Sequence, residues 1–278
     1  MLQPLRQEGT SSCLALADGV ETVRPLLQRL LVESDTLNVA WQGGYQSATP
    51  GTAFFFAYQA AMRCIDPDLQ PGAIAAFVIS EREMKSLSTM ATCVNADGTI
   101  SGVKSHAMLA SSGLEKLYVV ARQDESIVCC LVDRSAPGVA VAESSKAQPF
   151  MPDLPHSPLM FSDTPAQVFC RDAHERLNKP FRYWEDVHGV LAMASWMCRQ
   201  SPQHCDELTV LACQLAELFR ADGSAYTLAA MDSFERLFAL LESVSQTLPA
   251  EARQLWQRDR MLMVFTQPLR QKIRSRLS

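Results

Sequence analysis

The stretch Cys93-Val94-Asn95-Ala96-Asp97-Gly98-Thr99-Ile100-Ser101-Gly102-Val103-Lys104 decides what fold the chain is expected to have. Short apolar runs at residues 90–94 and 99–103 flank a four-residue turn, Asn95 to Gly98, whose residue types favour a β-hairpin. Working outward, further short apolar runs lie at residues 73–80, 117–121, 127–132, 139–141 and 159–161. No helical pattern separates these runs, so we expect an antiparallel β-barrel or sandwich.

Helical patterns lie on both sides of this β-block. Residues 11–68 are predicted to be helical, with a loop over residues 41–51 because Gly43, Gly44, Pro50 and Gly51 fall there. After residue 172, four amphipathic stripes predict a four-helix bundle. The fourth stripe consists of Leu255, Leu262, Phe265, Leu269 and Ile273, with a kink expected at Pro268. We therefore predict an α+β, predominantly helical fold with an N-terminal helical domain (1–72), a β-domain (73–168) and a bundle (169–278).

Composition narrows the class of protein. The 278 residues carry a net charge of −5, with 47% hydrophobic and 20% charged residues, which indicates a globular protein and gives no reason to expect nucleic acid as a partner. We find no secretory signal and no apolar run long enough for a membrane span, so a cytoplasmic location is expected. The nine scattered cysteines show no metal-ligand spacing; we expect reduced, apolar thiols, with a reactive cysteine as the alternative.

Three motifs in the β-block resemble those of acyl-CoA dehydrogenases. Residues 97–104 resemble the family's recurring hairpin, residues 136–139 its Pro-Gly-Val turn, and residues 159–165 the strand that leaves its β-domain. The order of helical block, β-block and bundle is also that of the family. The resemblance implies a shortened, divergent member of it, with FAD as cofactor, an acyl thioester as substrate and pairing of subunits through the bundle.

The family's flavin-binding positions are only partly matched. Ser80 and Glu81 resemble the start of the loop that binds the flavin, but residues 82–85 replace its Pro-Gly part. The resemblance places Lys104, His106 and Met108 beside the flavin, where His106 can stack on a flat ring and Met108 cannot donate a hydrogen bond. No glycine follows Gly223, so the family's late glycine-rich segment, which grips the adenine half of the cofactor, is missing.

The catalytic carboxylate is the least defined part of the expected site. Removal of a proton next to a thioester requires a carboxylate on a bundle helix. The family's early position for this carboxylate aligns near residues 179–180. Glu185 lies one to two turns further on, so it is the candidate if the helix is shifted relative to the family's. Two functions therefore stay open. One is a flavin-dependent oxidoreductase acting on an acyl thioester; the other is a non-catalytic homologue that serves as a partner subunit or binds an acyl thioester or acyl carrier. A homodimer, or a heteromer with a related subunit, is expected in either case.

Overall fold

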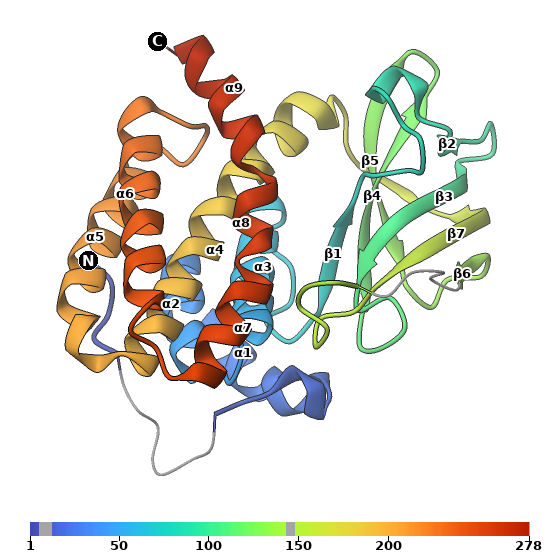
Figure 1. Cartoon of the computed structure of the whole chain (residues 1–278). Coiled ribbons are helices and arrows are strands. Elements are labelled where there is room, and N and C mark those ends of the chain that lie inside the picture. The colour runs from blue at the N-terminus through green and yellow to red at the C-terminus, as the bar shows by residue number, and fades with distance from the viewer. Residues whose placement is uncertain (6–12, 143–147, 278) are drawn as a thin grey trace. The chain divides into compact units, whose positions relative to one another are not determined.

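A computed structural model describes residues 1–5, 13–142 and 148–277; residues 11 and 12 of the predicted first helical block lie outside this part. The chain divides into two compact units. The helical unit contains Met1–Pro71, Pro149–Asp153 and Pro180–Ser278, and the β-unit contains Gly72–Gln148 and Leu154–Lys179. The two helical parts of the sequence thus form one unit (Figure 1).

Three helices form the first part of the helical unit: α1 (Val20–Glu33), α2 (Thr36–Gln46) and α3 (Pro50–Ile65). Each of the last two begins at a side-chain cap, because Asp35 accepts a hydrogen bond from Asn38 N and Thr49 accepts one from Thr52 N. Every residue of α3 except Cys64 is buried; most of them are apolar, and buried Arg63 donates to Gln59 Oε1 at 3.2 Å.

The prediction of a loop over residues 41–51 is wrong for most of its length, because α2 continues to Gln46. Its two glycines are explained by close packing. A Cβ added at Gly43 would lie 2.3 Å from the Phe56 ring, and one at Gly44 would lie 2.3 Å from the Ala192 carbonyl oxygen. Gly43 and Gly44 let neighbouring helices approach the backbone of α2, so glycine marks a helix contact here.

The second part of the helical unit contains α4 (Lys179–Gln200), α5 (Cys205–Ala221) and α6 (Leu228–Ser245). The fourth stripe is divided into α7 (Ala250–Asp259), α8 (Met261–Phe265) and α9 (Gln267–Leu277), and Pro268 lies in the first turn of α9. The predicted buried face of this stripe is wrong. Trp256, Met263 and Arg270 are buried, whereas Phe265 and Leu269 are exposed, because Arg270 turns toward a buried carboxylate.

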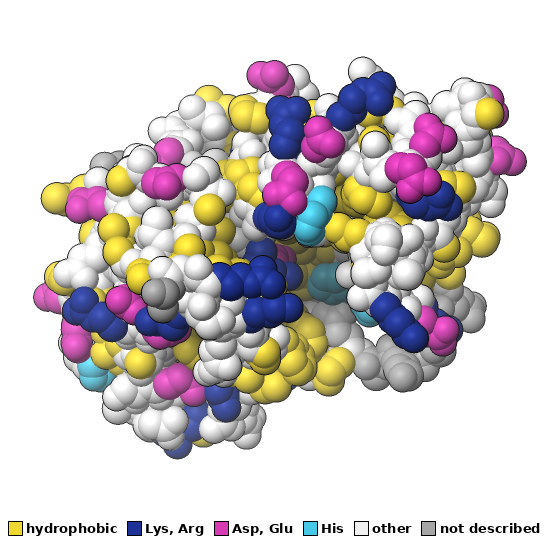
Figure 2. Space-filling view, turned by 90° about the horizontal axis from the view of Figure 1, so that it is seen from above, with side chains coloured by type: hydrophobic (Ala, Val, Ile, Leu, Met, Phe, Trp, Pro, Cys, Tyr) yellow, Lys and Arg dark blue, Asp and Glu magenta, His cyan; other side chains and the backbone are white. Residues whose placement is uncertain are grey.

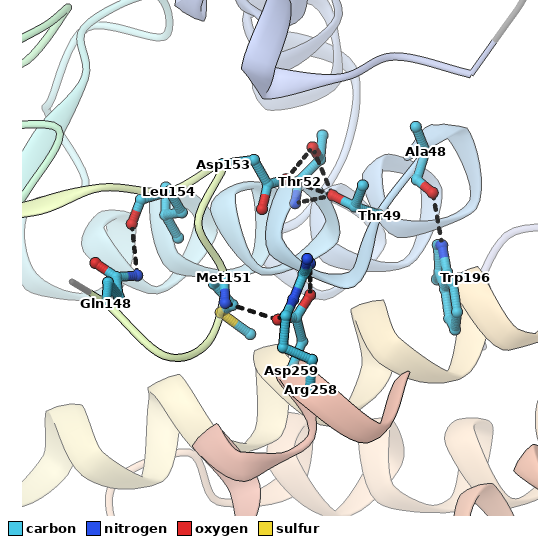
Figure 3. A network of polar contacts seen from close by, with 10 residues as sticks. All are labelled: Ala48, Thr49, Thr52, Gln148, Met151, Asp153, Leu154, Trp196, Arg258 and Asp259. Carbon is cyan, nitrogen blue, oxygen red and sulfur yellow. Dashed lines mark hydrogen bonds and ion pairs between the residues drawn. The ribbon is translucent and has the colours of Figure 1, made fainter. Parts of the chain in front are cut away.

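A five-residue segment, Pro149–Asp153, belongs to the helical unit although β-strands precede and follow it in the chain. Figure 3 shows Asp153 beside Thr52 and Thr49, where its carboxylate accepts their hydroxyl hydrogen bonds at the start of α3. The Met151 amide donates to Asp259 Oδ1 at 2.6 Å, and Asp259 is also paired with Arg258 at 2.6 Å. Asp259, which is fully buried, therefore joins this segment to α7.

The described part of the β-unit contains eight strands in one sheet: β1 (Ala75–Val78), β2 (Cys93–Val94), β3 (Thr99–Met108), β4 (Lys116–Gln123), β5 (Ser126–Asp133), β6 (Val139–Val141), β7 (His156–Pro165) and β8 (Gln167–Cys170). Their order is β6-β7-β3-β2-β4-β5-β8, and β1 pairs with β4 (Figure 1). The predicted hairpin is confirmed, because β2 pairs antiparallel with β3 around Gly98, which has a φ of 85°. A second hairpin joins β4 to β5, which also pair antiparallel.

The predicted antiparallel barrel or sandwich needs two corrections. The sheet is mixed, since β4 lies parallel to both β1 and β2. It is also not a closed barrel: in the described residues its order runs from β6 at one end to β8 at the other. Alternation of apolar residues specifies which side chains face the core but not the direction of the neighbouring strand, so these two features are not readable from the pattern.

Candidate functional site

The residues expected to contact a cofactor lie on β3 and on the segment that follows β1. Ser105 on β3 donates two hydrogen bonds to the Ser80 carbonyl oxygen, from its amide at 2.8 Å and its hydroxyl at 3.1 Å. His106 follows directly, with its Nδ1 2.8 Å from Ser105 Oγ. The fold thus brings Ser80, Ser105 and His106 into one exposed patch, which we call the Ser80–His106 patch.

Lys104 directly precedes Ser105 on β3, and its side chain makes its contacts inside the β-unit. Its side chain is fully buried, and Nζ donates to the Ile79 carbonyl oxygen at 3.0 Å and to Glu81 Oε1 at 2.8 Å. The Glu81 carboxylate also accepts hydrogen bonds from the Ala91 and Thr92 amides. Lys104 therefore anchors the segment after β1, and its ammonium group is not presented to a ligand.

The pKa of the Glu81 carboxyl reflects this anchoring. Burial alone would raise the pKa of Glu81, but the hydrogen bonds from Lys104, Thr92 and Ala91 outweigh burial and hold it below its ordinary value. Burial has the larger effect on the partner and lowers the pKa of Lys104 despite the attraction of Glu81. We take the pair as charged near neutral pH, because Glu81 has two backbone donors in addition to the lysine.

Met108 and His156 lie side by side in the sheet. They are register partners in the antiparallel pairing of β3 with β7, and Met108 is buried. The His156 amide donates to Gln148 Oε1 at 3.0 Å. Burial is the main cause that lowers the pKa of His156 to about 4, and the nearby His106 acts in the same direction. The sequence patterns did not predict that His156 lies near His106, because the β3–β7 register brings these distant residues together.

The segment after Glu81 has no cradle for a phosphate group. Glu83 adopts a left-handed backbone conformation with φ of 63°, and Met84 N approaches the Glu81 carbonyl oxygen at 3.4 Å. Residues 82–85 contain no glycine, so the backbone cannot approach a phosphate as closely here as in a glycine-rich loop. This segment therefore does not suit a pyrophosphate, whereas exposed His106 offers a flat ring.

Glu185, the candidate base, lies on α4 in the helical unit. Its carboxylate is 2.9 Å from the Arg182 guanidinium, and its side chain is only 14% exposed. Burial raises the pKa of Glu185 and the neighbouring Asp186 raises it further, while Arg182 acts in the opposite direction. A carboxyl group with a raised pKa is suited to general-base chemistry. Arg182 is thus engaged in an ion pair with the candidate base.

The neighbouring Asp186 forms a buried polar cluster that the sequence patterns did not predict. Its carboxylate accepts hydrogen bonds from Tyr226, from Thr266 Oγ1 at 3.3 Å and from Arg270 Nη1 at 3.2 Å. Arg270 also lies over the Phe234 ring, with Cζ 4.3 Å from the ring centroid. The cluster joins α4 to α9, so Asp186 has a structural role beside Glu185.

No family model matches the chain, and no curated protein matches its sequence. Solved structures do match. Butyryl-CoA dehydrogenase from Megasphaera elsdenii superposes with a TM-score of 0.62 at 13% identity, over 85% of this chain and 79% of that one. The chain has the acyl-CoA dehydrogenase fold.

Other proteins with the acyl-CoA dehydrogenase fold match over similar lengths. FkbI, for biosynthesis of a methoxymalonyl extender unit, has a TM-score of 0.59 at 17% identity, over 86% of this chain and 87% of that one. The prolyl acyl carrier protein oxidase AnaB has a TM-score of 0.56 at 15% identity, over 83% and 75% of the two chains. At these identities the likeness establishes the fold, and activity must be argued from the residues.

Proposed function

We propose that this chain is a flavin-dependent oxidoreductase of the acyl-CoA dehydrogenase type that acts on an acyl thioester. The shared fold supports this proposal, since its structural neighbours include a butyryl-CoA dehydrogenase, an acyl carrier protein oxidase and a protein solved with FAD. The flavin, when bound, would take up the electrons removed from the substrate. The chain would provide the ring contact and the base.

The Ser80–His106 patch is the observation that carries the proposal. His106 is exposed on β3, and Ser105 orients its imidazole ring. A flat, exposed ring of this kind can stack on another flat ring. Glu185, whose pKa is raised, is our candidate for holding the proton removed from the substrate. Residues 82–85 contain no glycine to bring the backbone close to a pyrophosphate, so we expect weaker FAD binding than a glycine-rich loop would give.

Titration of the purified protein with FAD, followed by the shift of the visible flavin bands, tests the proposal. We expect His106→Ala to weaken FAD binding by about five- to tenfold, because one stacking contact of about 1 kcal/mol is lost. His106→Phe, which keeps a flat ring, should bind FAD within about twofold of the unmodified protein. His174→Ala, elsewhere in the β-unit, is the matched control. A protein that takes up no FAD would rule out the oxidoreductase.

A second function, a non-catalytic binding module or partner subunit, is favoured by the contact between Lys104 and Glu81. The resemblance would place a flavin-binding loop at this segment. Here the segment is instead held against β3 by this ion pair, and its residues 82–85 contain no glycine. Such a protein would bind an acyl thioester or an acyl carrier without flavin, as a homodimer or beside a related subunit. Thermal stabilisation by butyryl-CoA in flavin-free buffer, with no stabilisation by FAD, would favour this function over the first.

A further inference from the structure

The outward face of α8 and α9 carries exposed apolar and basic side chains together. Phe265 is 59% exposed and Leu269 is 42% exposed. Lys272 and Arg276 follow on α9 and are also exposed, and the four positions are separated by four, three and four residues, as on one face of a helix. Thr266, between the two helices, has helical φ and ψ of −87° and −9°, so this face continues from α8 to α9. We call it the α8–α9 face.

The part of the sequence that contains the α8–α9 face carries basic but no acidic residues. Residues 260–278 contain five basic residues and no acidic residue, so all 30 acidic residues of the chain lie earlier in the sequence. Three of the five basic groups are paired within the helical unit: Arg260 with Glu242 at 3.0 Å, Arg270 with Asp186 at 3.2 Å and Arg274 with Asp232 at 2.5 Å. Among the described residues, Lys272 and Arg276 have no carboxylate within ion-pair distance.

These two cations and two apolar side chains fit one kind of occupant. Anchoring to an anionic lipid surface generally takes four to eight basic residues, and only two are available here. A second copy of this chain in a symmetric contact would place this basic face against its own equivalent, which is unfavourable. An acidic protein surface with a central apolar contact complements the face in both charge and polarity.

We propose that the α8–α9 face docks an acidic, helical carrier protein that presents the acyl thioester on a phosphopantetheine arm. Lys272 and Arg276 would meet carboxylates of the carrier, and Phe265 and Leu269 would form the apolar centre of the contact. The Phe150 ring, whose centroid is 5.6 Å from that of Phe265, would support the anchor from the helical unit. This inference rests on the proposed acyl-thioester function and adds the class of partner.

Lys272 and Arg276 are exposed, and the ion pair with buried Asp186 is made by Arg270. Figure 2 shows acidic and basic side chains interspersed on the visible surface of the protein. Arg171 and Arg236 are exposed basic residues that do not belong to the α8–α9 face. Reversing their charges changes the net charge of the protein by the same amount as reversing Lys272 and Arg276, which provides a matched control.

Binding of a recombinant acyl carrier protein bearing a phosphopantetheine arm, measured by calorimetry on the full chain, tests the docking. We expect Lys272→Glu/Arg276→Glu to weaken binding by about tenfold or more, and Phe265→Ser/Leu269→Ser to do the same, while Arg171→Glu/Arg236→Glu stays within about threefold. Binding of the unmodified protein should also weaken as salt is raised. The circular dichroism spectra of all variants should be alike, because the substituted side chains are exposed.

The outcomes separate docking from catalysis. Oxidation of a butyryl-pantetheine thioester by the FAD-loaded protein needs no carrier, so it reports the proposed function alone. Turnover of that thioester without any carrier binding would overturn the docking inference and leave the oxidoreductase standing. Carrier binding that both pairs of substitutions leave unchanged would also overturn it. A change of oligomeric state in Lys272→Glu/Arg276→Glu, without an effect on carrier binding, would assign the face to a second copy instead.

Discussion

Lys104 shows how one residue can match a family position and have a different role in the structure. Its place after the hairpin is the one that the resemblance assigns to the flavin site, yet its side chain is fully buried against Glu81. A buried ion pair costs desolvation on both sides and is favourable only when hydrogen bonds complete it, as the Ala91 and Thr92 amides do for Glu81. The pair thus holds the segment after β1 against β3.

We predict that Lys104→Met lowers the free energy of unfolding by about 3–5 kcal/mol, because it leaves the Glu81 carboxylate buried without its cation. Adding Glu81→Gln removes that charge while keeping an oxygen for the two amides, so the double variant should regain part of the loss. Urea denaturation of the two single variants and the double variant measures the coupling. Additive losses in the double variant would show that the two side chains act independently.

At the scale of elements, α2 shows a limit of pattern reading. Gly43 and Gly44 ordinarily weaken a helix by about 1 kcal/mol each relative to alanine, and their presence predicted a loop. In the structure they are sites of close helix contact, and the missing side chains are what allow the packing. By contrast, most of α3 lies in the region that was predicted to be helical, and only Pro50 and Gly51, assigned to the loop, form its first two positions after the capping threonine.

We predict that Gly44→Ala destabilises the protein by about 1–3 kcal/mol, although the same change in an isolated helix would be stabilising. The added Cβ would meet the Ala192 carbonyl oxygen, which belongs to the backbone of α4 and cannot rotate away. Ser243→Ala, on an exposed position of α6, is the control and should change stability by less than about 0.5 kcal/mol. Equal thermal midpoints of Gly44→Ala and the unmodified protein would contradict the close contact.

For the whole molecule, buried His188 and half-buried His156 make folding sensitive to acid. Burial lowers the pKa of both His188 and His156 to about 4, whereas an unfolded histidine titrates near 6.5. Between these pH values the unfolded chain binds more protons than the folded one, so lowering the pH favours unfolding. No helix among the described residues is long and apolar enough to cross a membrane.

We predict that the free energy of unfolding falls between pH 7 and pH 5, and that fully buried His188 accounts for about 2 kcal/mol of the loss. His188→Leu should therefore lose about 2 kcal/mol less than the unmodified protein over this interval, whatever its stability at pH 7. Urea denaturation at both pH values measures the difference, with His174→Leu as the control. The same pH dependence in His188→Leu and the unmodified protein would contradict the prediction.

The sequence by itself determined the order of helical and β segments, the hairpin around Gly98 and, through residues 97–104, the resemblance to the fold. These depend on local residue types and on the period of apolar positions, which act over a few residues. Only the tertiary structure decided the parallel pairing of β4, the helical state of Gly43 and Gly44, the inward turn of Arg270 and the burial of Lys104. Each of these depends on a partner distant in sequence, because close packing and desolvation are settled by the neighbours that the fold supplies.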